Sequence, residues 1–130
     1  TPTATVTLGY APPYDVTYTY RPATHTWARS YATTPHRAAS GAVIAPTNVI
    51  IQFVTYDGGG DAQLVGDAPG QSAWVLTDGT LTRGHWAKPD PTTPTQFTDP
   101  SGAPITLRAG RTWVELVPAA APVRVTHPAR

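Results

Sequence analysis

The chain contains no cysteine, and lysine and glutamate are nearly absent, with one of each among 130 residues. The lack of cysteine excludes a disulfide scaffold, a thiolate zinc site and a cysteine nucleophile. Lys88 and Glu115 are the single lysine and glutamate. Because both residue types favour helices on exposed surfaces, their scarcity argues against amphipathic helices.

No apolar run is long enough to cross a bilayer, and the opening residues, TPTATVTLGY, do not form a secretory signal peptide. The chain opens on threonine rather than methionine, which favours a mature or truncated product. Nine Lys and Arg residues oppose eight Asp and Glu residues, and the arginines are scattered. This near-neutral balance argues against nucleic acid as the main partner.

What the chain does contain favours strands. Threonine occurs 22 times, 15 prolines and 11 glycines supply turns, and four Trp, six Tyr and two Phe supply core material. The length is sufficient for one domain with its own core. We therefore predict a single all-β domain over residues 1–130, an antiparallel β-sandwich or a partly open barrel with Pro/Gly-rich loops.

Alternation of apolar and polar residues places the strands. In residues 15–20, Val16, Tyr18 and Tyr20 share one face. Residues 48–54 (NVIIQFV) are the most apolar run and predict a central buried strand. The other predicted strands cover residues 3–8, 26–31, 62–65, 72–77, 80–86, 105–107 and 112–117.

Turn residues separate these strands. Asp78-Gly79 predicts a two-residue hairpin of type I′, which needs positive φ at both central residues. Residues 1–13 combine an N-terminal strand with a Pro-rich breaker, and residues 33–40 are expected to form a loop. The tail, residues 119–130, either adds an edge strand or frays.

Several spaced motifs then occur in one order: NVIIQFV, AWVLTDGTLTRGHWAK at residues 73–88 and TQFTDPSGAPITLRAGRTWVELVP at residues 95–118. Over residues 14–118 the chain resembles the C-terminal domain of the YerB-like bacterial lipoproteins. The resemblance implies an extracytoplasmic place in the bacterial cell envelope and a lipid-anchored parent protein. The lipid-bearing cysteine and the usual N-terminal domain are not in this chain. The family has no assigned activity, so the resemblance supplies no catalytic residues.

Residues 57–61, Asp-Gly-Gly-Gly-Asp, are a candidate metal-binding loop. Asp57 and Asp61 could offer carboxylates to a hard cation such as calcium. The loop lacks the carboxylate count and closing Glu of an EF-hand, and a plain hairpin loop is the favoured interpretation. No cofactor is expected.

The candidate binding residues are histidines, an aromatic residue and their charged neighbours. Trp86 lies beside Lys88 and a proline-rich loop, which makes it a candidate half-exposed binding residue. The alternative is that Trp86 packs in the core, as tryptophan side chains usually do. Glu115 shares a strand face with Trp113 and is expected at the surface or paired with Arg108 or Arg111. The candidate binding residues are His36, Arg37, His85, Trp86, Lys88 and Asp99.

Three functional hypotheses follow. The first is a non-catalytic binding or assembly module of the bacterial cell envelope, whose partner is an envelope protein or a wall polymer. The second is an envelope hydrolase acting on a cell-wall substrate. The third is a support domain for a missing N-terminal domain, which would leave an exposed apolar patch. The hydrolase hypothesis requires a site assembled from His36, Asp57, His85 and Asp99.

Overall fold

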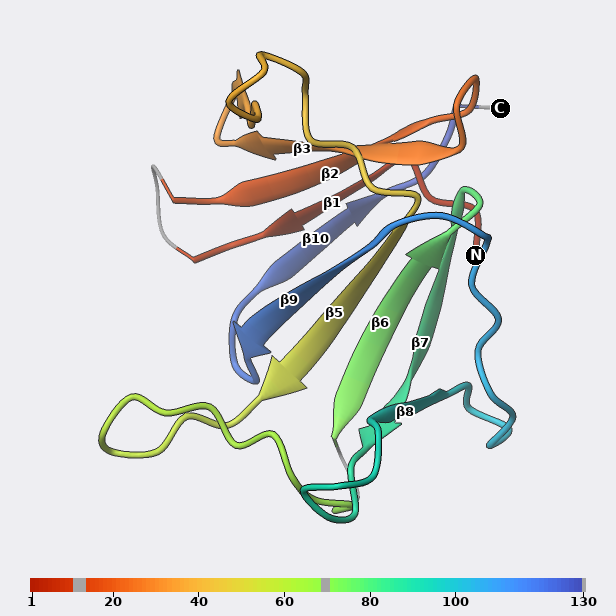
Figure 1. The fold of residues 1–130 in the computed structure, drawn as a ribbon. Coiled ribbons are helices and arrows are strands. Elements are labelled where there is room, and N and C mark those ends of the chain that lie inside the picture. Colours follow the sequence, from red (N-terminus) through yellow and green to blue (C-terminus); the bar gives the residue numbers. More distant parts are fainter. Residues whose placement is uncertain (11–13, 69–70, 130) are drawn as a thin grey trace.

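The computed structural model of the chain describes residues 1–10, 14–68 and 71–129, and within them two five-stranded sheets pack face to face (Figure 1). The outer sheet has the order β10-β1-β2-β3-β4 and the central sheet the order β8-β7-β6-β5-β9. The outer-sheet strands are β1 (Thr5–Leu8), β2 (Val16–Arg21), β3 (Thr26–Tyr31), β4 (Thr34–Pro35) and β10 (Val123–Thr126). The central-sheet strands are β5 (Asn48–Val54), β6 (Ser72–Thr77), β7 (Thr80–Ala87), β8 (Gln96–Thr98) and β9 (Thr112–Pro118).

The all-β sandwich is confirmed, and three strands (β3, β5 and β6) have the predicted bounds. The predicted hairpin is also confirmed, because Asp78 and Gly79 both have positive φ, 48° and 75°, between β6 and β7. The tail adds an edge strand, β10, beside β1. No described segment forms a helix long and apolar enough to cross a membrane.

Four expectations about strands were wrong. The central sheet is mixed rather than antiparallel, since β9 runs parallel to β5, and residues 105–107 form no strand. Residues 62–65 contribute only a bridge between Ala62 and Tyr56, and the predicted loop 33–40 contains the short strand β4. Residues 11–13 of the predicted breaker, and Arg130 of the tail, lie outside the described residues.

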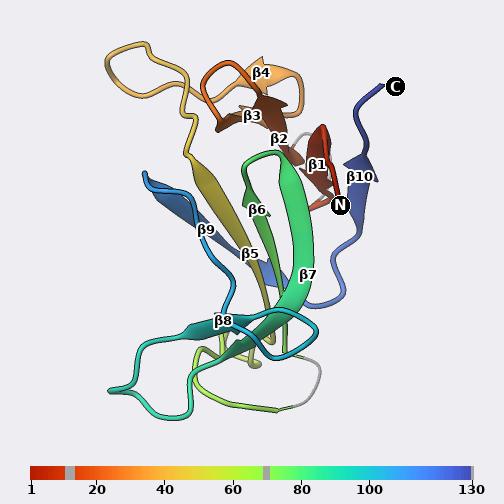
Figure 2. The same cartoon turned by 90° about the vertical axis from the view of Figure 1, so that its right-hand side faces the viewer.

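The parallel pair follows from the path of the chain after β8. Residues 99–111 run from the β8 edge of the central sheet to its other edge, where β9 begins (Figure 2). β9 starts at the same end of the sheet as β5, so the two strands run parallel. A parallel neighbour can be reached only through a long crossover connection. Along this path Ile105 packs against Gly84 of β7.

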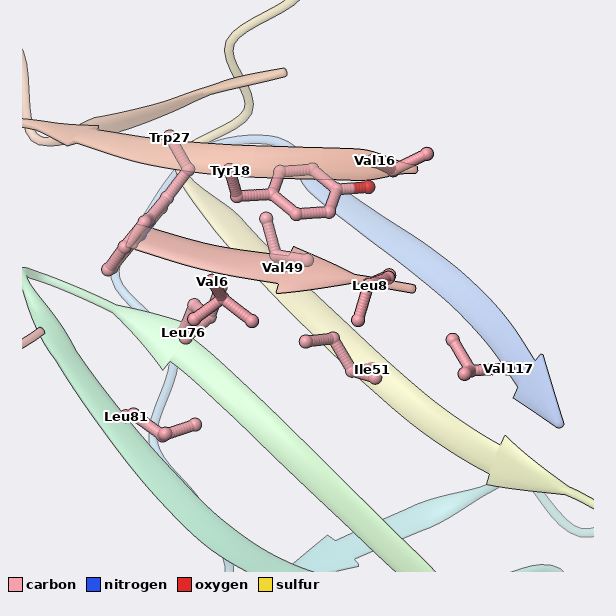
Figure 3. Close-up of a cluster of buried hydrophobic side chains, with 10 residues drawn as sticks. All are labelled: Val6, Leu8, Val16, Tyr18, Trp27, Val49, Ile51, Leu76, Leu81 and Val117. Carbon is pink, nitrogen blue, oxygen red and sulfur yellow. The ribbon is translucent and has the colours of Figure 1, made fainter. Parts of the chain in front are cut away.

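The main core lies between the two sheets (Figure 3). Its largest side chains, Trp27 and Tyr18, project from β3 and β2 and are fully buried. They face the alternate residues Val49 and Ile51 of β5. Full burial of each aliphatic side chain contributes about 1.5–3 kcal/mol. The remaining core members are Val6, Leu8, Val16, Leu76, Leu81 and Val117.

A smaller core lies on the opposite face of the central sheet, around Val54, Ala73 and Trp86. Here β8 approaches β7 so closely that a Cβ on Gly84 would lie 2.1 Å from the carbonyl oxygen of Thr98. A glycine is therefore required at position 84 by the close approach of the two backbones.

Candidate functional site

The only glutamate of the chain lies in a buried ion pair between the two sheets. Glu115, on the inward face of β9, accepts a hydrogen bond of 2.6 Å from Nη2 of Arg29 on β3. The two side chains are 12% and 6% exposed. Arg29 Nε also donates to Glu115 Oε1, at 3.1 Å. A carboxylate and a guanidinium this deeply buried require each other, because either charge alone would be costly.

Aromatic side chains complete the hydrogen bonding of this carboxylate. The hydroxyl of Tyr18 donates to Oε1 at 2.6 Å, and the hydroxyl of Tyr10 donates to Oε2 at 3.1 Å. Trp113 Nε1 donates to Oε1 at 3.2 Å. Burial and the neighbouring negative charge of Glu115 raise the pKa of both tyrosines above their ordinary value. Both hydroxyls therefore remain protonated donors at neutral pH.

The guanidinium of Arg29 is held equally firmly. Its central carbon lies 4.7 Å from the ring centroids of both Tyr31 and Trp113, within the range of cation–π attraction. Burial opposes its charge, yet hydrogen bonds to Glu115 and Tyr18 raise the pKa of Arg29 above its ordinary value. All three guanidinium nitrogens of Arg29 and both carboxylate oxygens of Glu115 are hydrogen-bonded. This group, which we call the Glu115 cluster, is suited to joining the sheets rather than to exchanging protons.

Sequence reasoning missed this pair, because the expected partners of Glu115 were Arg108 and Arg111. The signal was present in the strand alternation: Arg29 shares a face with Trp27, which is fully buried. An arginine on the core face of one strand and a glutamate on the core face of another predict a buried pair.

His36, one of the predicted binding residues, borders the cluster. Arg29 Nη1 lies 2.8 Å from His36 Nδ1, and since a guanidinium can only donate, Nδ1 must be the acceptor. The imidazole also packs against Tyr31, with 4.7 Å between ring centroids. Burial and the positive charge of Arg29 lower the pKa of His36 from its ordinary value of 6.5.

This lowered pKa predicts a pH dependence of stability. Below about pH 6.5 the His36 of the unfolded chain takes up a proton while the folded chain resists it. The unfolded state then binds more protons, so the free energy of unfolding is expected to fall as pH decreases from about 7 to about 5. Urea unfolding of the wild type and of His36→Gln across this range measures the effect. The wild type should lose more stability than the variant, and parallel curves would contradict the prediction.

A pocket of about 480 Å³ opens beside the cluster, where the loop of residues 38–46 overhangs the start of β9. We call it the seam pocket. Its lining is largely apolar on the loop side, and residues 111–113 form the opposite wall. Among the described residues, the guanidinium of Arg111 has no hydrogen-bond or ion-pair partner. The residues that line the pocket include Ala42, Val43, Ile44, Pro46, Arg111 and Trp113.

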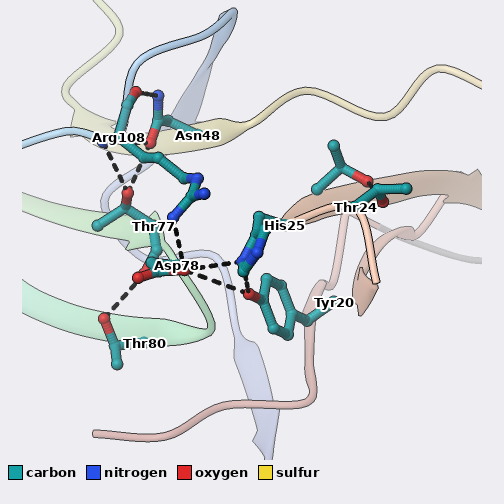
Figure 4. A network of polar contacts seen from close by, with 9 residues as sticks. Tyr20, Thr24, His25, Asn48, Thr77, Asp78, Thr80 and Arg108 are labelled. Carbon is teal, nitrogen blue, oxygen red and sulfur yellow. Dashed lines mark hydrogen bonds and ion pairs between the residues drawn. The ribbon is translucent and has the colours of Figure 1, made fainter. Parts of the chain in front are cut away.

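A second polar network ties three loops together at the end of the sandwich (Figure 4). Asp78, in the β6–β7 turn, lies 3.0 Å from Nδ1 of His25 and 3.3 Å from Nη1 of Arg108. These groups are about half exposed, so their ion pairs contribute little. Asn48 anchors the buried part of the network by accepting from the backbone N–H of Arg108 and donating to its carbonyl.

The other predicted binding residues lie apart from one another. Trp86 is 2% exposed, and its Nε1 donates to the carbonyl of Phe53, so the expectation of a half-exposed position was wrong. Trp86 packs against Val54 and Ala73 in the smaller core on the other face of the central sheet, which accounts for its burial. Lys88 donates to the carbonyl of Thr93 within its own loop.

Two further candidates serve their own loops. Arg37 donates to the carbonyl of Gly41 and so braces the loop of the seam pocket. Asp99 accepts hydrogen bonds from the backbone N–H groups of Ser101 and Ala103, and the hydrogen bonding with Ser101 lowers the pKa of Asp99.

The Asp-Gly-Gly-Gly-Asp segment forms a closed hairpin loop. Asp57 accepts hydrogen bonds from the N–H groups of Gly59 and Asp61, so its carboxylate serves the turn. Within the described residues, no three His, Asp or Glu side chains gather closely enough to hold a metal ion.

The four residues of the hydrolase hypothesis do not assemble into a site. His85 lies 3.6 Å from Asp67, whereas His36 contacts Arg29. Asp57 and Asp99 each cap a separate turn. All four side chains are described, and no hydrogen bond or ion pair joins any two of them. The expected catalytic arrangement was therefore wrong in its geometry.

Comparisons with known proteins agree with this fold. None of the curated proteins compared with the chain matches it. The crystal structure of the YerB protein from Bacillus subtilis superposes with a TM-score of 0.72 at 19% identity, covering 95% of this chain. The chain spans 45% of the YerB chain, less than half its length. The family model described as "Protein of unknown function (DUF3048) C-terminal domain" matches residues 6–114. The chain therefore belongs to this family of DUF3048 C-terminal domains.

Proposed function

We propose that this domain is a non-catalytic binding module of the bacterial cell envelope and that it binds through the seam pocket. The observation that carries the proposal is the unpaired guanidinium of Arg111 at the rim of a largely apolar pocket of about 480 Å³. Concave, mostly apolar pockets with a few polar groups are the usual form of binding sites.

The non-catalytic character rests on the state of the buried polar groups. Glu115 is the buried carboxylate nearest the pocket, and both of its oxygens already accept hydrogen bonds. A general acid or base must instead reach a substrate proton. The placement in the envelope rests on the resemblance to the YerB-like lipoproteins.

Binding to an envelope fraction tests the proposal. The purified domain should be retained saturably by the wall and membrane fraction of its host, and retention should fall in Ala42→Arg, which fills the pocket from an exposed loop position. Arg124→Ala, at an exposed position on β10, is the matched control. Release of soluble wall fragments by the wild type, lost on changing His85 or Asp99, would show an enzyme and overturn the proposal.

A support role for another domain is the second candidate. The chain spans 45% of YerB, so more than half of that protein lies outside the matched region. Leu64 and Val65, after β5, are exposed neighbours that such a domain could cover. Co-expression with the remainder of its parent protein should then give a stable complex that Leu64→Ser/Val65→Ser weakens, and an unchanged complex would exclude that contact surface.

A further inference from the structure

We propose that the occupant of the seam pocket is an extended segment of a partner polypeptide that adds as a strand beside the start of β9. The segment places an apolar side chain in the pocket and a carboxylate on Arg111. This inference rests on the proposed function and specifies the partner class. Strand addition to an exposed sheet edge is a common mode of peptide recognition.

The first support is the free edge of the central sheet. β9 is the last strand of that sheet, and no described strand pairs with its outer edge. Near its C-terminal end, the hydroxyl of Tyr56 donates to the carbonyl of Leu116 and occupies that part of the strand. At the start of β9, Thr112 and Trp113 line the pocket. The next residue, Val114, is 47% exposed. Unpaired edge N–H and C=O groups are a template for another strand.

The second support is the chemistry of the pocket. Ala42, Val43 and Ile44 give it an apolar wall suited to an aliphatic side chain. The opposite wall includes Trp113, whose ring is fixed by a hydrogen bond to Glu115 and by the stacked guanidinium of Arg29. A ring already held in place loses little freedom when a ligand packs on it, which favours binding.

The third support is charge complementarity. Arg111 is the one charged residue among those lining the pocket, and no acidic residue accompanies it. Its guanidinium has no partner within the described residues. A carboxylate matches the fork of N–H donors on arginine in two parallel hydrogen bonds. The partner segment should therefore carry an Asp, a Glu or a free C-terminus close to its apolar anchor.

A polypeptide accounts for these features better than a wall polymer does. An anionic glycan would use Arg111 but would leave both the backbone edge of β9 and the apolar wall unused.

Selection from a phage-displayed library of random peptides on the immobilised domain tests the inference. Enriched peptides should combine β-branched apolar residues with an acidic group. Their affinity should fall roughly tenfold for Arg111→Glu, because a hydrogen bond to a charged group is lost. It should also fall for Ala42→Arg and remain unchanged for Arg124→Glu. Circular dichroism and thermal unfolding establish that each variant is folded.

The outcomes separate this inference from the proposed function. Equal binding of the enriched peptides to Arg111→Glu, or the absence of enrichment, overturns the peptide occupant. Arg111-dependent sedimentation with purified wall sacculi, without peptide enrichment, would identify a wall polymer instead and leave the binding function standing. Failure of the peptides, the sacculi and the envelope fraction together would overturn both proposals.

Discussion

Replacing Glu115 with alanine is expected to destabilise the domain by about 3–5 kcal/mol, because it leaves the guanidinium of Arg29 buried without its counter-charge. The hydroxyls of Tyr18 and Tyr10 and Nε1 of Trp113 lose the same acceptor. Since a domain of this kind has a total stability of about 5–15 kcal/mol, the variant should be close to unfolding. Urea unfolding followed by tryptophan fluorescence measures the change.

A double-mutant cycle separates the ion pair from general damage. Arg29→Met and Glu115→Leu should each be strongly destabilising, and the double variant should be less destabilised than the sum of the two. Arg124→Ala, at an exposed position, should change stability by less than about 0.5 kcal/mol. Additive effects of the two cluster variants would show that the pair is not coupled.

The second large effect is expected at Asn48, the fully buried first residue of β5. Its amide donates to the carbonyl of Arg108 at 2.8 Å, and its oxygen accepts from the hydroxyl of Thr77 at 2.6 Å. Asn48→Ala should cost about 2–4 kcal/mol, since each buried polar group left without a partner costs about 1–3 kcal/mol. It should also speed amide exchange in residues 105–111, which Asn48 anchors.

Arg108→Ala is the matched control for Asn48. It keeps the backbone groups that Asn48 binds and removes a side chain that is 43% exposed. Its effect should stay within about 1 kcal/mol, as for other exposed ion pairs. A loss of stability at Asn48→Ala no larger than at Arg108→Ala would contradict the anchoring role of the asparagine.

Local features of this fold are predictable from sequence, because they depend on neighbouring residues. The alternation in residues 26–31, the apolar run in residues 48–54 and the turn at Asp78-Gly79 each specify their structure within a few residues. The position of Trp86 is not local, since its burial depends on where β8 and the residues after β5 return to cover the sheet.

The parallel pairing of β5 and β9 and the seam pocket are not local either. Both depend on where residues 99–111 deliver the chain after a long crossover, and no periodic pattern encodes that path. Strand alternation can assign Arg29 and Glu115 each to a core-facing position. Because the two residues lie 86 positions apart, only the fold shows that they pair with each other. Arg111 can be identified as a candidate binding residue only from the pocket that it lines in the folded chain.

Amide hydrogen exchange of the domain with and without its tightest selected peptide tests most directly whether the seam pocket is the binding site. We predict slower exchange on binding in residues 112–114 and in the loop of residues 42–46, with no change in β10, an edge strand of the outer sheet. Slower exchange confined to β10 or to β8, with residues 112–114 unchanged, would contradict binding at the seam pocket.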